Sequence, residues 1–210
     1  MKKNIIFDKY VNVHNQMIDS HGFTEKSLWG SKASQQIRFK KFLELFQAKD
    51  SFSVLDIGCG LCDFHKYLLD NGFNNFKYTG LEINPKFVKI VKESSPEIDI
   101  IEGSIDALNQ NQEWDYVVAS GIFNLGESVE DTTNFFINQF KIIYPNINKG
   151  FAVNFLSKYS ENQDNTSIYH DPINILQNCL VEFSKYVRLD QNYLPHDFTV
   201  FVYKYNLEML

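Results

Sequence analysis

The sequence predicts an α/β fold in which a doubly wound, mostly parallel sheet has helices on both faces. Short runs of apolar and β-branched residues alternate along the 210-residue chain with segments whose apolar residues recur at helical spacing. A glycine-rich turn directly follows the first of these runs. The hydrophobic content of 44% is ample for a core, so a single domain over residues 1–210 is expected.

The first unit of this fold spans residues 54–69. Residues 54–57 read Val-Leu-Asp-Ile, which is typical of a buried strand, and a Gly-Cys-Gly turn over residues 58–60 follows. Glycine lets the backbone turn sharply and a ligand approach closely, where a Cβ would clash. Residues 61–69 then carry apolar side chains at helical spacing. A strand, a glycine-rich loop and a helix in this order present a nucleotide-like cofactor at the carboxyl end of the strand.

Six further strands are expected after this unit. Their runs are bounded by turn residues, and helical segments separate the earlier ones, which implies parallel pairing. Two helix starts are marked by an N-cap residue followed by proline, at Asn84-Pro85 and at Asp171-Pro172. The expected strands lie at residues 78–83, 98–102, 114–120, 150–156, 186–189 and 198–205.

The residues of the glycine-rich loop distinguish between two cofactors. A dinucleotide fingerprint needs a third glycine where this chain has Asp63, and a pyrophosphate would be repelled by Asp56. A carboxylate beside the loop suits a ligand with positive charge, such as an ammonium or a sulfonium. The Asp-x-Gly-x-Gly form therefore favours S-adenosylmethionine (SAM) over NAD.

With this loop the sequence resembles the class I SAM-dependent methyltransferases. The resemblance implies a Rossmann-like, seven-stranded sheet whose last strand is antiparallel. It also implies that Glu82, at the end of the second strand, accepts hydrogen bonds from both ribose hydroxyls. After the third strand the family often has an aspartate that accepts from the adenine amino group. This chain has Ser104 there, so Ser104 and Ile105 are the expected adenine contacts, with Asp106 as the alternative.

An N-terminal segment is expected to complete the site. The apolar residues of 39–46 recur at i, i+3, i+4 and i+7, which predicts a helix with one apolar face. Together with Trp-Gly-Ser at residues 29–31, this pattern resembles the N-terminal segment of a group of small bacterial methyltransferases. By that resemblance the segment folds over SAM, and Arg38 pairs with the methionine carboxylate. The alternative is that Gln35 and Arg38 are solvated helix residues.

The expected domain therefore consists of an N-terminal helical cap, residues 1–48, and an α/β core, residues 49–210. In the resembled enzymes the loop after the fourth strand borders both the methionine part of SAM and the methyl acceptor. The residues expected to contact SAM are Trp29, Gln35, Arg38, Asp56, Gly58, Cys59, Gly60, Glu82, Ser104, Ile105 and Ser120.

Charge and residue usage exclude several other functions. A formal net charge of −6 opposes nucleic-acid binding, which needs clustered Lys and Arg. The N-terminus lacks the apolar stretch of a signal peptide and no run approaches a membrane span, so a cytoplasmic protein is expected. Cys59 and Cys62 have a Cys-x-x-Cys spacing but no further ligands at zinc-like spacing, so no metal site is expected.

The expected methyl acceptor is an oxygen or nitrogen atom of a small polar metabolite. Residues 121–125 lack the Asn/Asp-Pro-Pro-Tyr/Phe motif of enzymes that methylate nucleobase amines. The resembled bacterial group is associated with surface-polysaccharide and natural-product pathways, which implies a sugar or a sugar-linked group. A general base is needed only where the acceptor carries a proton. His170 and His196, which flank the late strands, are the candidate bases or substrate contacts.

Two alternatives share these motifs. An aminopropyltransferase that uses decarboxylated SAM would have the same loop and the same ribose-binding acid, but Arg38 would then have no methionine carboxylate to pair with. A non-catalytic SAM-binding protein that serves another protein as a partner would also keep Asp56, Gly58, Gly60 and Glu82. The motifs therefore predict SAM binding more directly than they predict methyl transfer.

Overall fold

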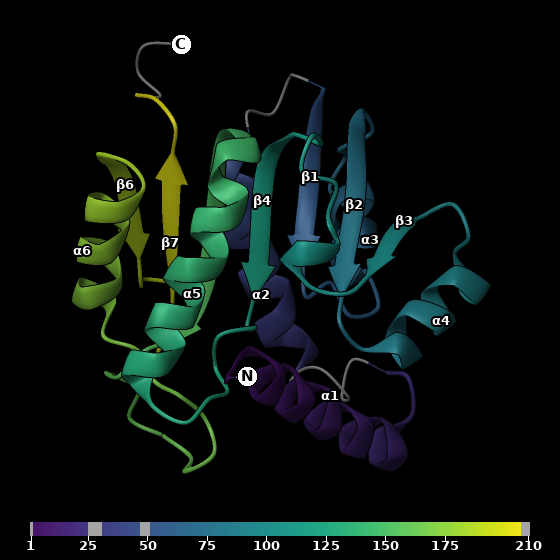
Figure 1. The fold of residues 1–210 in the computed structure, drawn as a ribbon, viewed down its shortest axis with the longest axis horizontal. Helices are drawn as coiled ribbons and strands as arrows, with labels where there is room; N and C mark the ends of the chain where they lie inside the picture. Colours follow the sequence, from purple (N-terminus) through teal and green to yellow (C-terminus); the bar gives the residue numbers. More distant parts are fainter. Residues whose placement is uncertain (1, 25–30, 47–50, 207–210) are drawn as a thin grey trace.

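A computed structural model describes residues 2–24, 31–46 and 51–206, and its centre is a seven-stranded sheet with helices on both faces (Figure 1). The strand order is β3-β2-β1-β4-β5-β7-β6, and β7 runs antiparallel to both of its neighbours while the other pairs are parallel. The predicted fold class is therefore confirmed. The strands are β1 (Phe52–Ile57), β2 (Phe76–Glu82), β3 (Asp99–Glu102), β4 (Trp114–Ser120), β5 (Ile147–Leu156), β6 (Tyr186–Asp190) and β7 (Asp197–Tyr203).

Helices connect the strands, and both predicted helix starts are confirmed. The Asn84 side chain accepts from the Lys86 backbone N–H at 3.0 Å, and the Asp171 side chain accepts from Ile173 N–H at 3.0 Å. None of the helices over the described residues is long and apolar enough to cross a lipid bilayer. The connecting elements are α3 (Asp63–Asp70), α4 (Pro85–Ser94), the 3₁₀ helix η3 (Ile105–Ala107), α5 (Val129–Ile143), the 3₁₀ helix η4 (Tyr144–Asn146) and α6 (Pro172–Glu182).

Two hydrophobic clusters, one on each face of the sheet, form the core. Along β1 the side chains alternate between them, so Val54 packs in the cluster with α2, α3 and α4, and Leu55 packs in the cluster with α5 and α6. In Figure 1, α5 and α6 lie in front of the sheet, and α2 and α3 lie behind it. Because β1 and β4 are covered on both faces, adjacent residues such as Val54 and Leu55, or Val117 and Val118, are both apolar and buried.

The N-terminal segment forms two helices, α1 (Lys2–His21) and α2 (Lys32–Phe42). The helix predicted through residue 46 ends earlier, at Phe42, and the 3₁₀ helix η2 (Leu43–Leu45) continues the chain. Phe39, Phe42 and Phe46 are nevertheless buried, as their spacing predicted. In Figure 1, α1 crosses below the carboxyl ends of β1 and β4, where an open α/β sheet binds its ligand.

Candidate active site

The glycine-rich loop after β1 forms one side of the site. Gly58 and Gly60 have φ angles of +71° and +56°, in the left-handed region that favours glycine. The Gly58 N–H donates to the Leu81 carbonyl at 2.8 Å, which ties the loop to β2. A Cβ on Gly58 would lie less than 3.0 Å from Ile122 Cγ2 in the loop after β4. Gly58 is therefore required both by its backbone angle and by the close approach of a second loop.

Glu82, at the carboxyl end of β2, joins this loop to the next helix. One carboxylate oxygen accepts from the Gly60 N–H at 2.9 Å and the other accepts from the Asn84 N–H at 2.8 Å. The residue is only 5% exposed, and this burial raises its pKa, although the same N–H groups act in the opposite direction. Each oxygen retains a second lone pair for a further donor. The carboxylate can therefore accept hydrogen bonds from a ligand without giving up its backbone contacts.

Asp56 gives the site a second buried carboxyl group. Its side chain accepts a 2.7 Å hydrogen bond from the Tyr78 hydroxyl. Burial, together with the nearby charges of Glu82 and Asp63, raises the pKa of Asp56 to about 7, although the Tyr78 hydrogen bond opposes this shift. Three carboxyl groups therefore surround one loop, an arrangement that favours a ligand carrying positive charge.

Helix α2 contributes two polar side chains to the site, and both are buried against acidic partners. Gln35 is 2% exposed and donates to Asp63 at 2.8 Å. Arg38 donates from Nε and Nη2 to the carboxylate of Asp197, at 2.5 and 3.1 Å. The alternative that Gln35 and Arg38 are solvated helix residues is therefore wrong. The sequence also did not indicate Asp197, 159 positions away, as a partner of Arg38.

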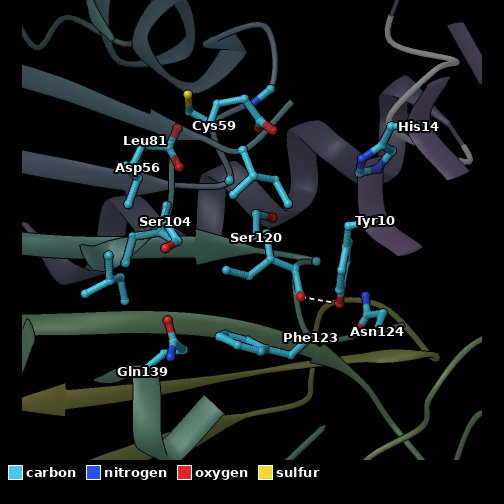
Figure 2. A pocket seen from close by; sticks show the side chains of 18 of the residues that line it. Tyr10, His14, Asp56, Cys59, Leu81, Ser104, Ser120, Phe123, Asn124 and Gln139 are labelled. Carbon is cyan, nitrogen blue, oxygen red and sulfur yellow. Dashed lines mark hydrogen bonds between the residues drawn. The ribbon is translucent and has the colours of Figure 1, made fainter. Parts of the chain in front are cut away.

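Helix α1 is fastened to the loop after β4. The Tyr10 hydroxyl donates to the Ile122 carbonyl, shown by the dashed line in Figure 2, and accepts from the Leu125 N–H at 3.1 Å. Lys9 also donates to the Gly126 carbonyl at 2.8 Å. The cap and the loop that borders the predicted acceptor site are therefore directly bonded to each other.

These elements surround a cavity that is drawn in Figure 2. Its lining combines the glycine-rich loop, the ends of β2 and β4, the turn after β3, both N-terminal helices and α5. Trp29 lies outside the described residues. The other ten predicted cofactor contacts all line the cavity: Gln35, Arg38, Asp56, Gly58, Cys59, Gly60, Glu82, Ser104, Ile105 and Ser120.

The two predicted catalytic histidines do not line this cavity. His170 is completely buried; its Nε2 donates to the Phe123 carbonyl at 2.8 Å, and Nδ1 lies 3.3 Å from the Thr133 hydroxyl. The side chain of His196 is 35% exposed, and its Nε2 lies 3.8 Å from Asp197. His170 therefore hydrogen-bonds the backbone of the loop after β4, and neither histidine is part of the cavity lining. Their role as bases or substrate contacts stays a prediction.

Five polar lining residues were not among the residues expected to contact SAM: Tyr10, His14, Asp63, Asn124 and Gln139. Tyr10 and His14 are one helical turn apart, so they share a face of α1. Gln139 follows Phe136 by three positions and precedes Phe140, which places an amide on the buried face of α5. A polar residue on an otherwise apolar face was the available signal. Which ligand that face meets depends on the tertiary structure.

The Cys-x-x-Cys pair packs within the glycine-rich loop. Cys59 and Cys62 are buried free thiols whose sulfur atoms are 3.6 Å apart. A Cβ on Gly80, in the neighbouring strand β2, would lie less than 3.0 Å from Cys59 Sγ. Within the described ranges, no group of three or more His, Cys, Asp or Glu side chains is arranged to hold a metal ion.

Comparison with known proteins identifies the family. A protein-family model described as a methyltransferase domain matches residues 54–145. The protein named "Putative methyltransferase Rv1506c" from Mycobacterium tuberculosis is 31% identical over 171 residues, which cover 77% of this chain and 99% of that protein. The chain belongs to the class I SAM-dependent methyltransferases.

Solved methyltransferase structures share the fold at low sequence identity. A SAM-dependent methyltransferase from Archaeoglobus fulgidus matches with a TM-score of 0.60 at 13% identity, over 83% of this chain and 95% of that one. Magnesium protoporphyrin IX methyltransferase from Synechocystis, with bound S-adenosylhomocysteine, matches with a TM-score of 0.58 at 12% identity, over 82% and 81% of the two chains. These structures show the shared fold, while the family model and the Mycobacterium relative confirm the prediction of a methyltransferase.

Proposed function

We propose that this methyltransferase binds SAM in the cavity of Figure 2 and methylates an oxygen or nitrogen atom of a small polar metabolite. The observation that carries the proposal is the position of the cap. Helix α1 contributes Tyr10 and His14 to the lining and is bonded to the loop after β4. A cavity covered in this way favours a small acceptor over a folded macromolecule.

The residues of the cavity fit the chemical groups of SAM. Glu82 has lone pairs on both carboxylate oxygens for the two ribose hydroxyls, as its hydrogen bonds to Gly60 and Asn84 leave them available. The buried Asp56 and the half-buried Asp63 favour the positive charges of the amino acid and sulfonium groups. Arg38 also lines the cavity, and its guanidinium, held in place by Asp197, is the proposed hydrogen-bond donor to the methionine carboxylate.

Positioning is the main task that these side chains would perform. Bound SAM supplies a methyl group on a sulfonium, and the neutral thioether is a good leaving group. The chain must therefore mainly align the acceptor with the methyl group and exclude water. His14 lines the cavity and is the proposed base for an acceptor that must lose a proton. Burial lowers the pKa of His14, which favours the neutral imidazole, the form that can accept a proton.

Sugars and sugar-linked groups are the first acceptors to test, because hydroxyl and amino groups are the atoms that they expose. We also infer that residues 1–210 act as one domain, since side chains from α1 and α2 complete the lining that the α/β core begins. A cytoplasmic location belongs to the same proposal, and cell fractionation tests it.

Calorimetric titration with SAM, S-adenosylhomocysteine, decarboxylated SAM and NADH is the first experiment. SAM and S-adenosylhomocysteine should bind and NADH should not. Glu82→Gln should weaken S-adenosylhomocysteine binding about 10- to 100-fold, because hydrogen bonds to a charged group contribute about 1.5–3 kcal/mol. Glu102→Gln is the matched control, because Glu102 is the register partner of Glu82 on β3 and its side chain is exposed.

Transfer of a labelled methyl group from SAM then tests the acceptor class. Sugars, amino sugars, small alcohols and small amines should include a substrate, whereas RNA and folded proteins should not be labelled. Labelling of macromolecules alone would contradict the proposed acceptor. Preferential binding of decarboxylated SAM would indicate aminopropyl transfer, and SAM binding without transfer to any acceptor would favour a non-catalytic role.

A further inference from the structure

Gln139 is a buried amide that faces the cavity. It is the eleventh residue of α5 and is only 7% exposed. Among the described residues, no backbone or side-chain group hydrogen-bonds its amide. Figure 2 shows the side chain directed from α5 into the cavity, on the side opposite Ser104. Because the amide faces the cavity and not another group of the chain, a ligand that hydrogen-bonds it would gain affinity.

The surroundings of Gln139 indicate which part of a ligand it meets. Phe140 and Phe135 of the same helix, Ile105 of η3 and Phe123 of the β4 loop also line this region. These apolar side chains suit a flat aromatic ring. Ser104, where related enzymes often have an aspartate, offers a hydroxyl in place of a carboxylate. The lining of the cavity therefore combines these apolar side chains with the amide of Gln139 and the hydroxyl of Ser104.

We infer that Gln139 recognises the edge of the adenine ring of SAM, a role that rests on the proposed SAM site. Adenine presents its amino group as a donor next to a ring nitrogen acceptor. A glutamine amide presents an acceptor next to a donor, so the two groups can form a pair of hydrogen bonds. Gln139 thereby supplies, from α5, the acceptor for the amino group that an aspartate after the third strand would have supplied.

Binding of two ligands that differ only in the ring tests this inference. S-adenosylhomocysteine is compared, by calorimetry, with its analogue that carries purine in place of adenine and so lacks the amino group. The wild-type protein should bind the purine analogue about tenfold more weakly, the effect of one lost hydrogen bond to a buried group. Gln139→Met keeps the length and volume of the side chain and should bind both ligands with nearly equal affinity.

Asn138→Met is the matched control, because Asn138 is the exposed neighbour of Gln139 on the same helix. It should retain the tenfold preference for adenine. Equal binding of the two ligands by the wild-type protein would overturn the inference, even if Gln139→Met did not fold. A preference that survives in folded Gln139→Met would also overturn it. Absence of S-adenosylhomocysteine binding by the wild-type protein would instead contradict the proposed SAM site itself.

Discussion

Substitution of Gly58 by alanine tests the central geometry of the site, the close approach of the loops after β1 and β4. Gly58→Ala adds two costs. The first is a left-handed backbone angle, φ +71°, in a residue with a Cβ, which costs about 1–2 kcal/mol. The second is the overlap of that Cβ with Ile122 Cγ2, at less than 3.0 Å. Forcing an extra methyl group into a packed position costs about 1–3 kcal/mol.

Gly72→Ala separates the two costs. Gly72 has a similar angle, φ +85°, but a Cβ there would have no neighbour within 4 Å. The left-handed backbone angle should therefore lower the free energy of unfolding of both variants. The overlap with Ile122 should make Gly58→Ala less stable than Gly72→Ala by about 1–3 kcal/mol. For a chain of this size that difference corresponds to about 2–12 °C in Tm. Urea unfolding provides the free energies and thermal unfolding provides the Tm values.

A second substitution checks that Ile122 is the cause. Ile122→Ala should destabilise the wild-type protein but should recover stability in the Gly58→Ala background, because it removes the overlapping atom. The coupling energy of this double-mutant cycle should be about 1–3 kcal/mol. If Gly58→Ala and Gly72→Ala unfold within about 0.5 kcal/mol of each other, the close approach of the two loops is refuted.

Three further predictions concern other contacts of the site. The raised pKa of Asp56, about 7 against about 3.9 in the unfolded chain, means that its ionisation destabilises the folded state. Asp56→Asn should therefore gain stability relative to the wild-type protein as the pH rises from about 4 to 7; a pH-independent difference in urea unfolding would contradict this. Asp197→Ala leaves the buried Arg38 guanidinium without its carboxylate and should cost about 3–5 kcal/mol, so a loss below 1 kcal/mol would show that the pair is not structurally important. Tyr10→Phe should cost about 1–2 kcal/mol and speed amide hydrogen exchange at Leu125, whereas unchanged exchange would mean that Tyr10 does not fasten α1 to that loop.

The local sequence was sufficient to predict the elements that position the cofactor loop. Val54 and Leu55 are adjacent in sequence and face opposite clusters, so a continuous apolar run correctly indicated a strand covered on both sides. Asn84-Pro85 and Asp171-Pro172 marked helix starts because an N-cap hydrogen bond involves only neighbouring residues. Asp56 and Glu82 lie at the carboxyl ends of paired parallel strands, which brings both acids to the glycine-rich loop.

The sequence by itself therefore determined the fold class, the glycine-rich loop and the acids beside it, because each depends on a repeating pattern or on near neighbours. The tertiary structure decided the contacts between distant segments: Arg38 with Asp197, Tyr10 with the loop after β4, and the direction of His170. It also placed Gln139 in the cavity. No local sequence pattern predicts such pairs, because they form only when the packing of separate helices and loops brings their side chains together.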